Sequence, residues 1–171
     1  MSSCCGPSRS SEPSPEAVAD GDGVGPRRQE LGPRPLMVEI PGGVFTMGTD
    51  DPRGYRDDGE GPTHEVELEP FLLGAYAVTN DEFAGFVEAT GHRTTAEEFD
   101  NSFVFGGLLP DDFPPTRGVA ATPWWREVIG ASWRHPEGPD SGIDGRGDHP
   151  VVHVSWVDAL AFCAWTGTRL P

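Results

Sequence analysis

The sequence predicts an α+β domain rich in loops, and three observations support that prediction. The 171 residues include 23 Gly and 18 Pro, about a quarter of the chain, so turns must occupy much of any fold. Apolar residues alternate with a period of two in some segments and follow a helical period in others, which indicates strands and helices in one chain. Apolar runs stay far below the roughly 18 residues of a membrane-spanning helix.

Residues 1–35 are expected to form a disordered tail. They are rich in Pro, Gly and Ser and contain no aromatic residue, so they offer little apolar surface to offset the entropy lost on ordering. The first aromatic residue is Phe45. We place the domain boundary near Leu36, with the domain covering residues 36–171.

Four short strands are expected at the start of the domain: Leu36–Ile40, Val44–Met47, His64–Leu68 and Phe71–Val78. Glycine and proline end the first two, and an acidic Gly/Pro loop, Thr49–Thr63, precedes the third. His64–Leu68 alternates with period two, which predicts that Val66 and Leu68 lie on a buried face.

A helix follows these strands. Its apolar face is expected to consist of Phe83, Phe86, Val87 and Thr90, which recur at helical spacing. Thr79 is suited to the N-cap, Glu82 completes a capping box, and Gly91 supplies the stop.

Residues 92–150 are expected to form a long irregular segment, with a single helical turn at Thr94–Phe99. An irregular segment of this length is normally functional or disordered, and its aromatic content favours order. A strand is then expected at Val151–Val154, and a second helix at Trp156–Thr166. Ser155 is expected to cap that helix and Gly167 to end it, with one side formed by Trp156, Leu160 and Cys163.

The net charge excludes some partners. It is −16, from 28 acidic and 12 basic residues, which disfavours binding to nucleic acids and to anionic membranes. A solvated acidic surface is the favoured interpretation, and complementarity to a basic partner or to metal ions is the alternative.

The three cysteines, Cys4, Cys5 and Cys163, do not make a disulfide scaffold. The N-terminal residues lack the basic segment followed by an apolar segment that a signal peptide has, so a cytoplasmic location is expected.

Few residues suggest chemistry by themselves. His149 and His153 have the spacing of a zinc-binding helix, but four residues of an expected strand span about 13 Å, so a structural pair is favoured. Cys163 is expected to be a buried inert thiol or to pair with a cysteine outside this chain. Of Trp124 and Trp125, we expect one to pack inward; the other either packs too or lines a peptide-binding groove.

Several motifs occur in a fixed order over residues 36–171, and together they resemble the formylglycine-generating enzyme, or sulfatase-modifying factor, family. They are Pro41-Gly-Gly-Val-Phe-Thr-Met-Gly48, Asp58-Gly-Glu-Gly-Pro62, Ser102-Phe-Val-Phe105, Pro123-Trp-Trp125, Trp133-Arg-His-Pro-Glu-Gly-Pro-Asp-Ser141, Asp148-His-Pro-Val-Val-His-Val-Ser-Trp156 and Trp165-Thr-Gly-Thr-Arg-Leu-Pro171. The resemblance implies a loop-rich fold related to C-type lectins, incomplete at its C-terminus because the family continues for roughly as long again.

The resemblance also implies an activity. Members of this family oxidise the cysteine of a Cys-x-Pro-x-Arg motif in a nascent sulfatase to Cα-formylglycine with O₂. A cysteine pair near the family's C-terminus binds Cu(I), and structural Ca²⁺ sites lie downstream too, so no catalytic residue or metal ligand is expected in this chain. The resemblance assigns Ser102 and Trp124 to the substrate peptide, and gives Cys163 and Arg169 structural roles.

We therefore expect the N-terminal portion of a bacterial formylglycine-generating oxidase, inactive by itself. One alternative is a non-catalytic, lectin-like binding protein of the same fold. A less favoured alternative is a non-haem-iron sulfoxide synthase, which would need an iron-binding helical domain and a His-x₃-His-x-Glu motif. Here Ser155 stands where that motif has Glu.

Overall fold

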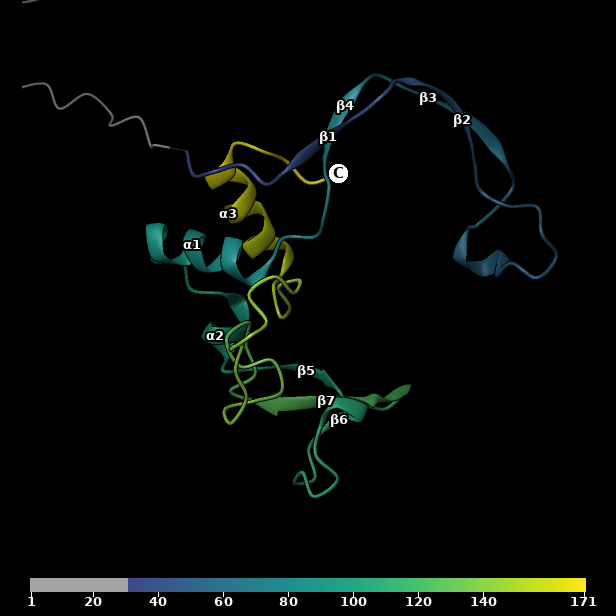
Figure 1. Cartoon of the computed structure of the whole chain (residues 1–171). Helices are drawn as coiled ribbons and strands as arrows, with labels where there is room; N and C mark the ends of the chain where they lie inside the picture. Colours follow the sequence, from purple (N-terminus) through teal and green to yellow (C-terminus); the bar gives the residue numbers. More distant parts are fainter. Residues whose placement is uncertain (1–30) are drawn as a thin grey trace, which may run out of the picture. The chain divides into compact units, whose positions relative to one another are not determined.

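The computed structural model describes residues 31–171 (Figure 1). Its elements are, in chain order, β1 (Met37–Ile40), β2 (Gly43–Met47), the 3₁₀ turn η1 (Arg56–Asp58), β3 (His64–Leu68), β4 (Phe71–Gly74), α1 (Asn80–Thr90), α2 (Thr95–Phe99), β5 (Asn101–Phe105), the 3₁₀ turn η2 (Gly106–Leu108), β6 (Gly118–Val119), β7 (Thr122–Ile129) and α3 (Trp156–Thr166). Residues 1–30 of the expected tail lie outside the described residues. Gly32, in the last part of that tail, donates its N–H to the carbonyl oxygen of Trp165 at 2.8 Å.

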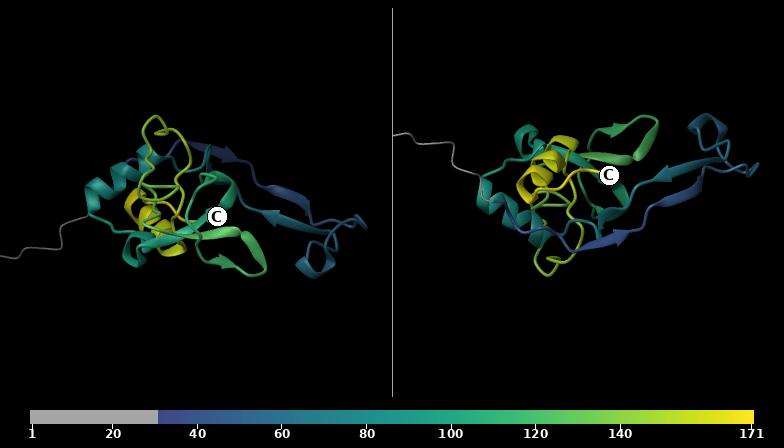
Figure 2. Two further views of the ribbon diagram at one scale, coloured as in Figure 1. Left: turned by 90° about the horizontal axis from the view of Figure 1, so that it is seen from below. Right: turned by 90° about the horizontal axis from the view of Figure 1, so that it is seen from above.

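The first four strands form two antiparallel pairs, β1 with β4 and β2 with β3. Because the chain runs out through β1 and β2 and returns through β3 and β4, one pair continues into the other (Figure 2). The four expected strands are confirmed, except that the last ends at Gly74 rather than Val78. The predicted buried face is wrong, since Val66 is only half-buried and Leu68 is 43% exposed. Leu68 stands opposite Gly43 at the end of the ladder, where no partner side chain covers it.

Both expected long helices are confirmed with their caps. Thr79 and Glu82 form the capping box of α1, and Gly91 ends it in the left-handed conformation at φ 69°. Ser155 and Asp158 form the equivalent box of α3. The single turn expected near Thr94 is α2, which has a capping box of its own.

An aromatic cluster joins α1 to α3. Its buried members are Phe83, Phe86, Trp133 and Phe162. The ring of Phe83 lies 5.3 Å from that of Trp133 and 6.1 Å from that of Phe162, measured between centroids. Trp133 is fully buried, so the loop that follows β7 is anchored in the same core as the helices.

The orientation of α3 differs from the one expected. Its buried residues are Asp158, Phe162 and Thr166, whereas Trp156 is 69% exposed and Leu160 is 37% exposed. Cys163 is half-buried, not buried. The helix turns this way because Phe162 packs on the Phe83 and Phe86 rings and Asp158 is held by hydrogen bonds from neighbouring segments.

The carboxylate of Asp158 is the centre of a buried polar network. It accepts hydrogen bonds from the backbone N–H of Ser155 at 2.7 Å and of Thr95 at 3.2 Å, and it lies 2.8 Å from Nε2 of His92. Burial acts to raise the pKa of Asp158, but the hydrogen bonds from Ser155, His92 and Thr95 together hold it below its usual value. The network therefore ties α3 to the segment between α1 and α2.

The segment expected to be irregular contains a three-stranded antiparallel sheet of order β5–β7–β6. A second apolar cluster lies on one of its faces, made of Val104, Val128 and Ala131 with Leu109 and Phe113 against them. The expectation of an irregular chain over residues 92–150 is therefore wrong for this part. β6 and β7 form a hairpin, with Val119 opposite Thr122, whereas β5 precedes them by a long loop and pairs with β7 only through the tertiary fold.

The strand expected at Val151–Val154 is absent from the structure of this part of the chain. The segment makes one isolated bridge, between Thr79 and Pro150. Pro150 has no N–H to extend a ladder, and His153 adopts the left-handed conformation at φ 56°. The expectation that an extended strand separates His149 from His153 is therefore wrong.

Candidate functional site

The two residues expected to contact a substrate peptide, Ser102 and Trp124, lie on one face of the β5–β7 pair. Ser102 stands opposite Val128, and Val104 stands opposite Arg126. Residues that face each other in an antiparallel pair share a face, and alternate residues along a strand do too. Trp124, two positions before Arg126, therefore lies on the same face as Ser102, about 13 Å further along β7.

Trp124 and Trp125 point to opposite faces of β7 because they are consecutive in a strand. Trp124 is 51% exposed and Trp125 is 42% exposed. The expectation that one of them packs inward is wrong, since neither is buried. Trp125 instead lies edge-on to Phe105, with 6.2 Å between the ring centroids.

The second face of this sheet is an exposed apolar surface that the sequence analysis missed. It consists of Phe103, Phe105, Trp125 and Ile129. The alternation of Ser102-Phe-Val-Phe105 is the sequence feature that indicates this surface, because Val104 is buried and the two Phe residues are exposed. Four residues are too few, however, to distinguish a strand from an irregular segment by sequence alone.

The hydroxyl of Ser102 is fixed by a histidine from a distant part of the chain. Oγ of Ser102 lies 2.8 Å from Nδ1 of His153. The other ring nitrogen of His153, Nε2, lies 2.9 Å from the carbonyl oxygen of Pro136. Ser102 and His153 are both half-buried, and Pro136 is buried. Ser102 and His153 both stand out in the sequence, but nothing in the sequence pairs them.

The loop that carries Pro136 is tightly folded. Ser132 and His135 exchange backbone hydrogen bonds of 3.0 and 3.1 Å, and Gly138 donates its N–H to His135. The side chain of Ser141 accepts from the N–H of Glu137 at 2.9 Å and donates to the carbonyl oxygen of Gly138. The motif that follows Trp133 therefore builds a rigid support for the carbonyl group of Pro136.

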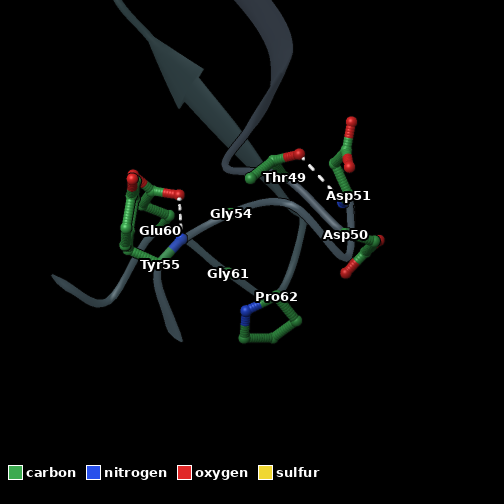
Figure 3. A pocket seen from close by; sticks show the side chains of 8 residues that line it. All are labelled: Thr49, Asp50, Asp51, Gly54, Tyr55, Glu60, Gly61 and Pro62. Carbon is green, nitrogen blue, oxygen red and sulfur yellow. Dashed lines mark hydrogen bonds between the residues drawn. The ribbon is translucent and has the colours of Figure 1, made fainter. Parts of the chain in front are cut away.

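The loop between β2 and β3 encloses a hollow of about 360 Å³. Figure 3 shows its lining, which consists of Thr49, Asp50, Asp51, Gly54, Tyr55, Glu60, Gly61 and Pro62. Each of its acidic side chains bonds within the loop: Asp51 to Arg53, Asp50 to Thr63, and Glu60 to the N–H of Tyr55. These hydrogen bonds lower the pKa values of Asp50 and Asp51. The carboxylates therefore hold the loop in shape.

The described residues do not fit a copper site. Soft thiolates select Cu(I), and the one thiol of residues 31–171 is that of Cys163, half-buried on α3. Within the same range, no group of three or more His, Cys, Asp or Glu side chains could hold a metal ion. Cys4 and Cys5 lie outside the described residues.

The remaining predicted site residue, Arg169, is exposed, and its guanidinium donates to the carbonyl oxygen of Leu170 at 3.0 Å. No helix of the described part of the chain is long and apolar enough to cross a membrane.

Comparison with known proteins identifies the family. Residues 24–171 match the model of the sulfatase-modifying factor enzyme 1-like domain. The formylglycine-generating enzyme of Mus musculus is 56% identical over 146 residues, covering 82% of this chain and 39% of the mouse protein. That of Thermomonospora curvata is 50% identical over 147 residues, covering 85% of this chain and 48% of the bacterial protein.

A relative named as inactive matches as well. The inactive Cα-formylglycine-generating enzyme 2 of Bos taurus is 50% identical over 137 residues, covering 79% of this chain and 45% of the bovine protein. Identity over this region therefore does not separate active from inactive relatives.

Among solved structures, that of PvdO from Pseudomonas aeruginosa matches with a TM-score of 0.47 and 32% identity, covering 77% of this chain and 39% of the other. The chain spans about half the length, or less, of the curated relatives described above. The matched domain and the identity to these relatives show that the chain belongs to the family of sulfatase-modifying factor enzymes.

Proposed function

We propose that this chain is the N-terminal part of an oxidase that converts the cysteine of a Cys-x-Pro-x-Arg motif in a sulfatase to Cα-formylglycine with O₂. Membership of the family supports the proposal. The substrate would be the unfolded or nascent sulfatase chain, since an extended segment is needed to bring the motif to a surface strand. A relation to C-type lectins and a cytoplasmic location stay predictions.

The proposal is assigned to particular residues because Ser102 and Trp124 lie on the same face of the β5–β7 pair. An exposed indole and a fixed hydroxyl on one sheet face can together hold an extended peptide, the ring by packing and the hydroxyl by hydrogen bonding. The face is open only at its two ends: Trp124 is 51% exposed and Ser102 is half-buried, whereas Val104 and Val128 between them are at most 2% exposed. This half would therefore bind substrate, and the copper thiolates and structural Ca²⁺ sites would lie beyond residue 171.

Adjacent tryptophans provide a matched test of this face. We expect Trp124→Ala to weaken binding of a fluorescein-labelled Cys-x-Pro-x-Arg peptide by about tenfold or more, measured by fluorescence anisotropy, because large buried aromatic contacts dominate such interfaces. Trp125→Ala removes a ring of similar exposure from the other face of the same strand and should change the affinity less than about twofold. Equal losses for both variants, or none for Trp124→Ala, would remove Trp124 from the site.

If this chain supplies substrate binding but not the copper ligands, the 171-residue chain should have no oxidase activity even where it binds the peptide. The described residues hold no thiolate pair, and a Cu(I) centre of this kind needs one. Mass spectrometry of the peptide after incubation with the chain, Cu(I), a reducing thiol and O₂ should find no formylglycine. Detectable conversion would overturn this assignment, whereas binding without conversion by a full-length protein would favour the non-catalytic alternative.

A further inference from the structure

The geometry around Ser102 defines which way its hydroxyl group points. His153 contacts Ser102 through Nδ1 at 2.8 Å and the carbonyl oxygen of Pro136 through Nε2 at 2.9 Å. A carbonyl oxygen can only accept a hydrogen bond, so Nε2 must carry a proton. In the neutral ring Nδ1 is then an acceptor, and the hydroxyl of Ser102 is the donor in the bond between them.

We propose that His153 is a positioning residue that makes Ser102 an acceptor toward the ligand. The proton of Ser102 is committed to Nδ1, so the lone pairs of Oγ are what the half-buried hydroxyl offers to a ligand. The group that they would bind is a donor, and in an extended peptide that donor is a backbone N–H. This inference rests on the proposed function, because it takes the peptide bound at Ser102 as its ligand.

The backbone of His153 supports a dedicated role. His153 and Asp100 are the two non-glycine residues with positive φ among residues 31–171. The left-handed conformation is unfavourable for a residue with a side chain, so such a residue persists there only where its surroundings hold it. Asp100 ends a helix as its C-cap, whereas His153 lies in an irregular segment and its ring is held at both nitrogens.

The two hydrogen bonds of the His153 ring also link three parts of the chain that no local structure brings together. Ser102 belongs to β5, Pro136 to the loop after β7, and His153 to the segment before α3. The rigid turn around Pro136 fixes one end of the ring, and the ring in turn fixes the serine rotamer. A hydroxyl held in this way loses less conformational entropy when a ligand binds.

The first experiment measures the tautomer of His153. Two-dimensional ¹⁵N–¹H spectra of the imidazole rings in the full chain, with the His153 signals assigned from His153→Asn, should show a protonated Nε2 and an unprotonated Nδ1 at pH 7. Ser102→Ala should move the Nδ1 signal, because it removes the donor. A proton on Nδ1, in either the other tautomer or the imidazolium, would overturn the inference.

The second experiment separates the ring from the backbone. His153→Asn keeps a residue that tolerates the left-handed conformation and places an amide oxygen close to the position of Nδ1. His153→Gly keeps the backbone and removes the acceptor. We expect His153→Gly to weaken binding of the Cys-x-Pro-x-Arg peptide about tenfold, as for one hydrogen bond of about 1.4 kcal/mol, and His153→Asn to stay within about threefold.

Near-UV circular dichroism should confirm that both variants are folded. Wild-type affinity in folded His153→Gly would overturn the positioning role, and so would an equal loss in both variants.

A scan of the peptide backbone identifies the group that Ser102 accepts from. Methylation of one backbone nitrogen at a time should weaken binding to the wild-type chain strongly at one position, and that position should have no further effect in Ser102→Ala. If methylation acts equally in both proteins, Ser102 accepts no N–H and the inference is overturned. If the unmodified peptide does not bind the wild-type chain at all, the proposed function fails, and the tautomer then decides the Ser102–His153 assignment alone.

Discussion

Asp158 shows how one side chain serves both its own helix and a distant segment. Its carboxylate caps α3 by accepting from the N–H of Ser155, and it also accepts from the N–H of Thr95 and contacts His92. A carboxylate that is only 1% exposed is stable as an ion only where such donors replace water. The N3 position of a capping box is usually at the surface, so the buried role of Asp158 is a tertiary feature.

We predict a pH-dependent loss of stability in Asp158→Asn. The pKa of Asp158 lies below its usual 3.8 in the folded protein, so the carboxylate stabilises the fold above about pH 4, and this contribution is lost as the pH falls through the lowered pKa. Asp158→Asn should therefore lower the free energy of unfolding by about 2 kcal/mol at pH 7, with a smaller difference below about pH 4. Urea titrations at several pH values measure both.

The matched control is Asp144→Asn, since Asp144 is exposed in a turn. It should stay within about 0.5 kcal/mol of the wild type over the same pH range. A loss in Asp158→Asn that does not change between pH 7 and pH 3 would contradict a role for the charge.

Each of the three helices within residues 31–171 begins with a capping box, and each ends at a residue in the left-handed conformation. The boxes begin at Thr79, Thr94 and Ser155. Such signals depend on a few consecutive residues, which is why the bounds of these helices were predicted closely. They also explain how a helix as short as α2 forms, because two of its free N–H groups are satisfied locally.

We predict that Thr79→Ala destabilises α1 by about 1 kcal/mol. The side chain of Thr79 accepts from the N–H of Glu82, and Glu82 accepts from the N–H of Thr79 at 2.9 Å. Urea unfolding followed by far-UV circular dichroism should show the loss. Thr79→Ser retains the hydroxyl oxygen and should remain close to the wild type, so an equal loss in both variants would point to packing of the methyl group.

At the scale of the whole molecule, the described domain has a small aromatic core and extensive exposed apolar surface. Phe83 and Phe86 are at most 2% exposed, whereas Phe103 and Phe105 are nearly half exposed. Exposed apolar patches of this kind mark interaction surfaces. Stability should therefore depend on the aromatic cluster between α1, α3 and Trp133, and very little on the outer sheet face.

We predict that Phe83→Ala lowers the free energy of unfolding by about 3–5 kcal/mol, because it removes a ring that contacts Phe86, Trp133 and Phe162. Against a typical total of about 5–15 kcal/mol, the variant should be largely unfolded or close to it. Phe105→Ala removes the same group from an exposed position and should cost less than about 1 kcal/mol. Urea unfolding of the two variants tests the comparison, and similar losses would contradict this view of the core.

The first half of the domain could be predicted well because its signals are local. The strands β2 and β3 follow from alternation and from the glycine and proline that flank them, although their pairing was not predicted, and α1 follows from its apolar period and its caps. The sheet of β5, β7 and β6 could not be predicted, because β6 has only two residues and β5 pairs with β7 across a long loop. Trp124 and Trp125 illustrate the difference: the sequence places them together, and only the strand places them on opposite faces.

The sequence by itself determined the helix ends, the early strands and, through its motifs, the family to which the chain belongs. The tertiary structure decided which side chains meet. Ser102 and His153 lie 51 positions apart, and neither alternation nor helical period relates residues at that distance. Their contact depends on the register of β5 against β7, on the turn around Pro136 and on the left-handed backbone of His153. Hydrogen bonds between near neighbours hold the turn around Pro136, but only packing of the whole domain brings it together with Ser102 and His153.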